Sequence, residues 1–115
     1  MKPERATQRA IRQYLALRGF ASVHVVNGTA LPGTPEQKAR LVAALKEDGL
    51  MVGFPDLLVY ASGGRVGHIE VKSSTGRQLP SQKAVEAWLG TLGHQYAVCR
   101  SVDDAAAALD AWGWA

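Results

Sequence analysis

The sequence predicts a mixed α/β sandwich with a β-hairpin in the middle of its sheet. Its segments follow the order helix, strand, helix, hairpin, helix, strand, helix, which is typical of a sheet flanked by helices. Both hairpin strands carry apolar residues on both faces, so we expect helices to cover the sheet on each side. The 115 residues, with 47% hydrophobic and 20% charged side chains, support one modest core and therefore a single domain over 1–115.

The first helix is expected over residues 3–18. Pro3 suits its first turn, and Gly19 suits a left-handed cap at its end. The apolar stripe consists of Ile11, Tyr14 and Leu15. Helical steps backwards along this stripe reach Glu4, which places an acid on the core-facing side of the first turn. Such an acid either complements the helix dipole or belongs to a functional site.

A short strand is expected over 22–26, followed by a turn at Asn27-Gly28. The run Thr34-Pro35-Glu36-Gln37 then provides an N-cap, a first-turn proline and a capping-box glutamine. It predicts a second helix over 35–48 that ends at Gly49. The side chains expected to pack inward from this helix are Leu41, Val42 and Leu45.

The hairpin strands are expected over 57–60 and 66–71, joined by the loop 62–64, which reads Ser-Gly-Gly. A loop of this length pairs Ala61 with Arg65. The register matters because side chains directly opposite each other in an antiparallel pair share a face, whereas a slip of one residue sends them to opposite faces.

This register brings two carboxylates together at the open end of the hairpin. Asp56 falls opposite Glu70, with β-carbons about 5 Å apart, and Lys72 follows on the same face. His68 shares this face one pleat deeper, so it either touches the site or packs beneath it. Two acids this close repel each other, so one takes up a proton near neutral pH unless a cation lies between them.

A divalent cation is the natural occupant of such a pair. Hard oxygen ligands, with no Cys or His among them, favour Mg²⁺ or Mn²⁺ over zinc. Mg²⁺ usually completes its shell with waters and substrate phosphate, which indicates phosphate chemistry. Lys72 is placed to orient or deprotonate a metal-bound water, or to stabilise the charge that develops on phosphorus.

The third helix is expected to begin at Pro80 and to end at Gly93. Its stripe of inward-facing residues is Gln82, Val85, Leu89 and Leu92. Gln82 is the single polar member of that stripe, and a polar group among apolar neighbours needs a partner. Capping of the helix's first turn by this side chain would supply one.

A strand over 96–100 and a helix from Ser101 complete the order. Cys99 lies in the apolar run of that strand, and a single cysteine excludes an internal disulfide and a cysteine-built zinc site. Two tryptophans close the chain, Trp112 and Trp114. They either cover an edge of the core or belong to a subunit contact.

These residues resemble the pattern of the VRR-NUC family, within the PD-(D/E)XK nuclease superfamily. The family pattern combines a Gly-x-Pro-Asp lead-in to the second strand, a Glu-x-Lys pair and a Gln in the next helix. Its matches here are Gly53-Phe54-Pro55-Asp56, Glu70-Val71-Lys72 and Gln82. The resemblance extends from Glu4 to about Leu109 and implies a restriction-endonuclease-like αβαββαβα core, with a mixed sheet flanked by helices.

The resemblance also implies a metal-dependent DNA endonuclease and assigns roles to individual residues. Its catalytic residues would be Asp56, Glu70, Lys72 and Gln82. Its ligands for Mg²⁺ or Mn²⁺ would be Glu4, Asp56, Glu70 and the carbonyl of Val71. The alternative class is a non-catalytic DNA-binding or assembly module, and an intact set of these residues weighs against it.

Basic and small residues are the candidates for DNA contact. Gly53 would let a phosphodiester backbone approach the metal closely, although a plain turn is the alternative explanation. Arg77 lies in the polar loop that follows Lys72, and Arg5 and Arg9 lie on the first helix. The net charge of +3 is a mild excess that suits a nucleic-acid binder.

One small domain carries one active site, and cutting two strands requires two, so we expect a two-fold homodimer. Stand-alone members of the family resemble Holliday-junction resolvases, which favours branched DNA such as four-way junctions, with simple duplex or flap DNA as the alternative. The sequence has no apolar run long enough to span a bilayer and no signal-peptide core. We therefore expect no membrane association and a cytoplasmic location in a bacterial or phage-infected cell.

Overall fold

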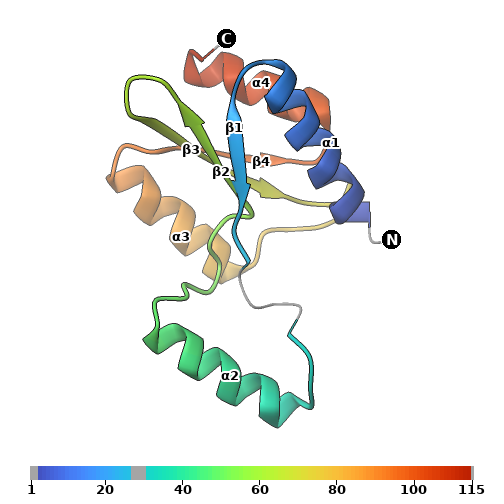
Figure 1. The fold of residues 1–115 in the computed structure, drawn as a ribbon, viewed down its shortest axis with the longest axis vertical. Helices are drawn as coiled ribbons and strands as arrows, with labels where there is room; N and C mark the ends of the chain where they lie inside the picture. Colours follow the sequence, from blue (N-terminus) through green and yellow to red (C-terminus); the bar gives the residue numbers. More distant parts are fainter. Residues whose placement is uncertain (1–2, 27–30, 115) are drawn as a thin grey trace.

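The computed structural model describes residues 3–26 and 31–114 (Figure 1). Within these residues it contains four helices and four strands in the predicted order. The elements are α1 Pro3–Leu17, β1 Ala21–His24, α2 Pro35–Glu47, β2 Leu57–Ala61, β3 Arg65–Val71, α3 Pro80–Thr91, β4 Gln95–Cys99 and α4 Val102–Trp112. The predicted turn at Asn27-Gly28 lies outside the described residues. In the described ranges, none of the helices is long and apolar enough to cross a bilayer.

The strands of the described chain form one mixed sheet in the order β1-β2-β3-β4, with the hairpin β2–β3 as its central pair. β1 pairs antiparallel with β2, and β2 with β3, whereas β3 runs parallel to β4. Parallel neighbours need a crossover connection, and α3 supplies it. The hairpin has the predicted register, with Ala61 opposite Arg65 and Leu58 opposite His68.

The helix ends follow the predicted capping residues. Thr34 Oγ1 accepts a hydrogen bond from the Gln37 amide at 3.2 Å, and Gln37 Oε1 accepts one from the Thr34 amide at 2.9 Å, which completes the capping box of α2. Gly19 has a φ of +87° and ends α1 in the left-handed conformation. Ser101 caps α4 by accepting from the Asp104 amide at 3.1 Å.

The main core lies between the sheet and the helices α1 and α4 (Figure 1). The hairpin contributes alternate apolar residues to it, namely Leu57, Val59, Ile69 and Val71. The helices contribute Ile11, Leu15, Ala105, Ala108 and Leu109. These side chains are at most 7% exposed, so this face supplies the apolar burial on which the fold depends.

The opposite face of the sheet is covered in part by α3. His68 and Glu70 alternate with the core residues of β3, so their side chains lie on this second face. α3 packs on β4 and buries Val85 and Leu89. Helices therefore cover both faces of the sheet, as the two-sided apolar pattern of the hairpin predicts.

Part of this second face is left open around β1 and β2. Val23 lies opposite Leu58, and Leu58 lies opposite His68, so these three side chains share the face on which α3 packs. α3 contacts chiefly β4, at the other edge of the sheet. Val23 and Tyr60 consequently remain 48% and 44% exposed.

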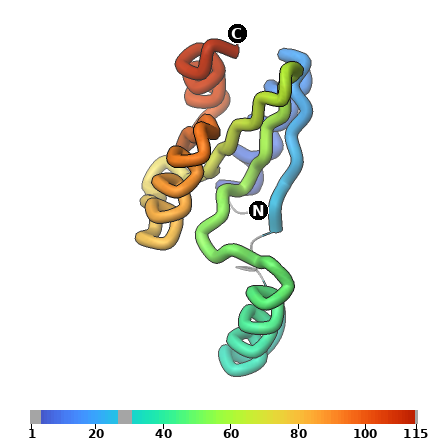
Figure 2. Tube along the Cα trace, turned by 90° about the vertical axis from the view of Figure 1, so that its left-hand side faces the viewer, coloured from blue at the N-terminus to red at the C-terminus, as the bar shows by residue number. Residues whose placement is uncertain are grey.

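The helix α2 does not pack inward as the sequence predicts. None of its residues, all of which the structure describes, is buried, and Leu41 is 39% exposed. Figures 1 and 2 show α2 standing clear of the sheet and of the other described helices. The prediction that Leu41, Val42 and Leu45 reach the core is therefore wrong. Helical periodicity identifies an apolar side on a helix, but it does not say which surface covers that side.

The C-terminal tryptophans cover an edge of the core. Trp114 is 7% exposed, and its ring meets that of Trp112 edge-on, with centroids 4.9 Å apart. Both rings lie over Gly67, where a β-carbon would come within 2.5 Å of the Trp112 ring. The absence of a side chain at Gly67 therefore makes room for the tail, and core packing is the interpretation that the structure supports.

Candidate functional site

The predicted acid pair forms at the open end of the hairpin. The β2–β3 ladder ends with Leu57 opposite Ile69, and one further step places Asp56 beside Glu70. Asp56 Oδ2 accepts a hydrogen bond of 2.8 Å from the amide of Val71, so the aspartate side chain reaches across to β3. The two carboxyl groups are close enough for the charge of Asp56 to act on Glu70.

Glu70 is a buried acid with a strongly altered pKa. The residue is only 2% exposed. Burial, followed by the charge of Asp56, raises the pKa of Glu70 from 4.5 to about 9, while the charge of Lys72 acts in the opposite direction. Without a cation, Glu70 therefore holds a proton at neutral pH, which is the behaviour expected of two closely opposed acids.

Lys72 lies beside this pair. Its Nζ is 3.8 Å from Glu70 Oε2, and its side chain is only 10% exposed. Its backbone amide donates a 3.0 Å hydrogen bond to the carbonyl of Cys99, which extends the pairing of β3 with β4 by one residue. The end of the sheet thus fixes the backbone of the lysine, and its ammonium group reaches the acids from a defined position.

Gln82 joins α3 to the acid pair. Its Nε2 donates a 3.2 Å hydrogen bond to Glu70 Oε2, and its Oε1 accepts one of 2.8 Å from the amide of Leu79. The residue is 8% exposed. The sequence left two interpretations open, a helix cap or a partner of the site, and one side chain fulfils both. The start of α3 is therefore locked to the orientation of the Glu70 carboxyl group.

Gly53 has a structural function that the sequence does not reveal. Its φ is +87°, and a β-carbon there would lie 2.6 Å from the carbonyl carbon and oxygen of Ser81 and 2.9 Å from the amide nitrogen of Gln82. The loop before β2 therefore passes directly against the first turn of α3, where only glycine leaves enough space. The predicted contact of Gly53 with DNA remains a prediction.

The acid pair fits a hard divalent cation. Glu70 Oε1 is buried and has no hydrogen-bond partner among the described residues. A buried oxygen in this state needs a partner, and a carboxylate oxygen beside a second carboxylate suits Mg²⁺ or Mn²⁺. Among the described residues there is no group of three or more His, Cys, Asp and Glu positioned to hold a metal. Two carboxylates with water are nevertheless a usual protein contribution to a Mg²⁺ shell.

Glu4 stands apart from the pair. It is exposed on the first turn of α1, and its charge makes the last and smallest contribution to the raised pKa of Glu70. The structure therefore places Glu4 within electrostatic reach of Glu70 without gathering it into a three-acid cluster. Its role as a metal ligand remains a prediction.

The comparisons with known proteins agree with this geometry. The family model of the VRR-NUC domain matches residues 2–103. The chain belongs to the VRR-NUC family. It also superposes on a solved structure described as "VRR_NUC domain" with a TM-score of 0.67, over 96% of this chain and 97% of the other, at 16% sequence identity. That likeness confirms the α/β fold. No curated protein matches the chain.

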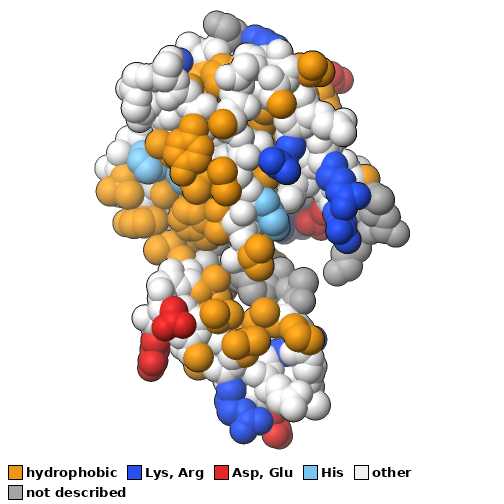
Figure 3. Space-filling view, in the orientation of Figure 1, with side chains coloured by type: hydrophobic (Ala, Val, Ile, Leu, Met, Phe, Trp, Pro, Cys, Tyr) orange, Lys and Arg blue, Asp and Glu red, His pale blue; other side chains and the backbone are white. Residues whose placement is uncertain are grey.

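Membership of the VRR-NUC family makes this chain a nuclease domain with DNA as its substrate. The residues predicted to contact DNA through arginine side chains all lie on the surface. Arg77 is exposed in the loop between β3 and α3, and Arg5 and Arg9 are exposed on α1. The same loop is held by Arg100, whose Nη2 donates a 2.6 Å hydrogen bond to the carbonyl of Gly76. Figure 3 shows basic side chains along the edge of the molecule where α1 lies.

His68 packs beneath the site of this VRR-NUC domain. Its Nε2 shares a 2.9 Å hydrogen bond with Nδ1 of His94, and its ring meets that of Phe54 edge-on with centroids 5.6 Å apart. Burial, and then the charge of His94, lower the pKa of His68 from 6.5 to about 4, so the ring is neutral at physiological pH. Of the two interpretations for His68, packing is the one that these contacts support.

Tyr96 is a neighbour of the acids that the sequence did not single out. It lies opposite His68, and Val98 lies opposite Glu70, so the tyrosine shares the Glu70 face of the sheet. Its hydroxyl accepts a 3.3 Å hydrogen bond from Gln78 Nε2. Burial, and then the charge of Glu70, raise the pKa of the Tyr96 hydroxyl. A strand was predicted here, but its register against β3 is not fixed by any short loop, so the tyrosine could not be placed.

Proposed function

We propose that residues 1–115 act as a single metal-dependent endonuclease domain that hydrolyses phosphodiester bonds in DNA. The observation that carries this proposal is the buried carboxyl group of Glu70, whose Oε1 has no partner among the described residues while Asp56 lies beside it. A carboxylate is costly to bury. A protein that only bound DNA would gain nothing from that cost, so the arrangement favours catalysis over a non-catalytic module.

The metal would be held by Asp56, Glu70 and the carbonyl of Val71, with Mg²⁺ or Mn²⁺ as the ion. When bound, it would activate water and neutralise charge on the scissile phosphate. Hydrogen bonds within the protein fix the orientation of both carboxyl groups. The Val71 amide holds one oxygen of Asp56 at 2.8 Å, and Gln82 holds Oε2 of Glu70 at 3.2 Å. Glu70 Oε1, which has no partner among the described residues, is left for the ion or for water.

Lys72 and Gln82 complete the proposed machinery. The Lys72 ammonium group, 3.8 Å from Glu70 Oε2, supplies a positive charge next to the reacting phosphate and a group that can exchange protons with water. Gln82 acts by orienting Glu70. Glu4 would add a further negative charge from α1, and Gly53, Arg77, Arg5 and Arg9 would contact the DNA backbone.

Branched DNA is the proposed substrate, with four-way junctions as the representative form. A domain of this size offers one acid pair, and cleavage of two strands needs two, so we place the enzyme in a homodimer whose two-fold symmetry matches that of a junction. Flap and simple duplex DNA are the alternative substrates. They differ from a junction in symmetry, so a comparison of the three distinguishes between these possibilities.

The test is cleavage of labelled duplex, flap and four-way junction DNA by the purified protein, with Mg²⁺, Mn²⁺, Ca²⁺ or chelator. Mg²⁺ or Mn²⁺ should support strand scission, whereas Ca²⁺ should support binding without scission. Asp56→Asn and Glu70→Gln should each reduce scission to background while the circular dichroism spectrum stays unchanged. Wild-type rates in either variant, or scission in chelator, would contradict the proposed mechanism.

A further inference from the structure

Asp56 has a different kind of neighbour on each side. On one side lies Glu70, across the pairing of β2 with β3. On the other side lies Val25, because the β1–β2 ladder ends with His24 opposite Leu57 and the amide of Val25 donates a 2.8 Å hydrogen bond to the carbonyl of Asp56. Side chains opposite each other in an antiparallel pair share a face, with β-carbons about 5 Å apart. The carboxyl group of Asp56 is therefore bordered by an acid on one strand and by an apolar side chain on the other.

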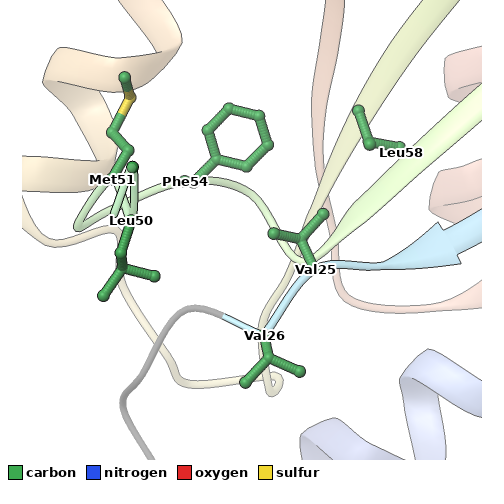
Figure 4. Close-up of a pocket in the computed structure, with 7 residues that line it drawn as sticks. Val25, Val26, Leu50, Met51, Phe54 and Leu58 are labelled. Atoms are coloured by element: carbon green, nitrogen blue, oxygen red, sulfur yellow. The ribbon is translucent and has the colours of Figure 1, made fainter. Parts of the chain in front are cut away.

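Val25 belongs to the wall of a hollow of about 410 Å³ on this face of the sheet. Apart from Gly49, the described lining consists of apolar side chains, namely Val25, Val26, Leu50, Met51, Phe54 and Leu58 (Figure 4). Leu58 follows Asp56 by two residues, so it also shares the face of the carboxyl group. Sites that enclose small molecules commonly have volumes of about 300–1,000 Å³ and largely apolar walls. The hollow has these properties, and it is continuous with the place where the scissile phosphate would bind.

The ring of Phe54 is the aromatic wall of the hollow. It meets the His68 ring edge-on, with centroids 5.6 Å apart, and His68 in turn stacks on His94, with centroids 5.1 Å apart. Figure 4 shows the Phe54 ring between Met51 on one side and Leu58 on the other. The contacts with the buried His68 hold the ring in place before any ligand arrives. A planar group that enters the hollow therefore meets a preformed aromatic surface.

The DNA substrate itself is the occupant that this position selects. Phe54 precedes Asp56 by two residues, at most about 7 Å along the chain, so a group in the hollow lies next to the scissile phosphate. A separate protein or a lipid would fill space that DNA needs during cleavage. Phosphate groups do not suit the hollow, because the described residues that line it carry no basic or polar side chain. Nucleobases are planar and uncharged, and they stack on aromatic side chains in proteins that bind single strands.

We propose that this hollow binds one unpaired nucleobase of the DNA strand that is cut. A base inside a duplex is stacked between its neighbours, whereas a base at a branch, flap or bulge can turn outward at a lower cost. The site deepens the proposed function and rests on it, because the acid pair must hold the adjacent phosphate. It also supplies a physical reason for a preference for branched DNA. The enzyme would select DNA that offers an unpaired base beside the position of cleavage.

The first experiment compares three DNA molecules that differ at one position of one strand. That position carries an extra unpaired base, the same extra nucleotide without its base, or no extra nucleotide. Dissociation constants are measured by fluorescence anisotropy in Ca²⁺, so that cleavage does not interfere. The protein should bind the DNA with the unpaired base about fivefold to 150-fold more tightly than the DNA that lacks this base, which corresponds to one stacked base. Equal affinities for these two molecules would overturn the proposal.

Met51→Asp and Val52→Asp form a matched pair of variants. Met51 and Val52 are neighbours that are 39% and 42% exposed, but of the two only Met51 lines the hollow. Both variants add the same charge to this segment, so the ratio of the two dissociation constants separates the contribution of the base from a general loss of affinity. Met51→Asp should abolish the preference for the unpaired base, and Val52→Asp should retain it. A preference that both variants retain, or that both lose equally, would contradict the proposal.

Phe54→Leu tests the aromatic wall. It keeps an apolar side chain but removes the ring, so it should also reduce the preference for the unpaired base, while circular dichroism shows that the fold is unchanged. Photocrosslinking then locates the base. DNA with 5-iodouracil at the unpaired position should crosslink to residues 25–26 or 49–58, as mapped by peptide mass spectrometry. Crosslinks confined to other segments would overturn the assignment of the hollow.

A second copy of the chain is the competing occupant of the hollow. Light scattering of the DNA-free protein tests for it, because a charge at Met51 would release a protein partner that covered this surface. Wild type and Met51→Asp should have the same mass, and a lower mass for the variant would overturn the proposal. The proposed nuclease is tested separately in Mg²⁺. Cleavage without a preference for the unpaired base would refute the base site alone, and the preference without cleavage would refute the nuclease alone.

Discussion

Gln82 and Glu70 are joined by a buried hydrogen bond of 3.2 Å from the amide Nε2 to the carboxyl Oε2. The same glutamine accepts from the Leu79 amide at 2.8 Å, so it cannot turn away from Glu70 without uncapping α3. These two hydrogen bonds fix the orientation of Gln82 against Glu70, and in the proposed mechanism Gln82 positions the carboxyl group that would hold the metal.

Gln82→Leu should therefore lower both stability and activity. It removes two hydrogen bonds and leaves a buried carboxyl oxygen without its partner, which typically costs about 1–3 kcal/mol. Loss of a group that orients a metal ligand typically reduces metal affinity or activity by about tenfold to a hundredfold. The measurements are chemical denaturation and the Mg²⁺ concentration that gives half-maximal cleavage. Gln95→Leu, at an exposed position at the start of β4, is the control and should change neither.

The stability of the metal-free protein should fall as the pH rises through the neutral range. The pKa of Glu70 is raised from 4.5 to about 9, so in this range the folded state keeps a proton that the unfolded state has lost. The contribution of this proton to the free energy of unfolding is fully present below pH 4.5 and is lost as the pH approaches 9. One retained proton corresponds to a change in the free energy of unfolding of about −1.4 kcal/mol per pH unit.

The lower limit of the pH range for this measurement is determined by His68, whose ionisation also affects stability. Its pKa is lowered from 6.5 to about 4, so its effect on stability is complete above pH 6.5. Denaturation curves in chelator between pH 6.5 and 9 should therefore show the negative slope in wild type. Glu70→Gln, which cannot ionise, should remove most of it. Equal slopes in the two proteins would show that Glu70 is ionised in the folded state.

Binding of Mg²⁺ should release a proton at neutral pH. Glu70 must ionise before it can act as a ligand, because its pKa is about 9 in the free protein. Calorimetric titrations in two buffers with different ionisation enthalpies should report about one proton released per ion bound. At a hundredfold excess over the dissociation constant, the ion should stabilise the fold by about 2.7 kcal/mol. Asp56→Asn should lose this stabilisation, and a variant that retains it would exclude Asp56 as a ligand.

Arg9→Gln and Arg77→Gln should each weaken DNA binding in a salt-dependent way. Both side chains are exposed, on α1 and on the loop before α3 respectively. Removing one arginine–phosphate interaction should reduce the slope of log K against log salt by about 0.9 for duplex regions. Binding measured by fluorescence anisotropy in Ca²⁺ separates this effect from cleavage. Arg40→Gln on α2 is the control, since that helix lies away from the acid pair, and it should leave the slope unchanged.

The acid pair was predictable from the sequence because one short loop fixes its register. The three residues at 62–64 pair Ala61 with Arg65, and from there the position of Glu70 relative to Asp56 follows by counting. Capping residues likewise act within a few positions, which is why the limits of the helices were close to those observed.

The features that the sequence did not reveal depend on contacts between distant segments. The contact of His68 with His94 requires the parallel pairing of β3 with β4, and a crossover helix leaves that register undetermined. The position of α2, clear of the sheet, does not follow from its periodic pattern, because that pattern identifies an apolar side but not the surface that covers it. Gly53 looks like a turn residue in the sequence, and its contact with Ser81 becomes visible only when the third helix has been placed.

Gly53→Ala tests that contact. The substitution combines two costs, a positive φ of +87° and a β-carbon 2.6 Å from the Ser81 backbone. Gly63→Ala is the matched control, because Gly63 has a φ of +78° but open space around the new β-carbon. Gly63→Ala should lower the free energy of unfolding only by the cost of placing a side chain at a positive φ, about 1–2 kcal/mol. Gly53→Ala should lose more, and because it displaces the start of α3 with Gln82, it should also reduce cleavage, which Gly63→Ala should not. Equal losses of stability and unchanged cleavage in both variants would show that Gly53 is a turn residue without influence on the site.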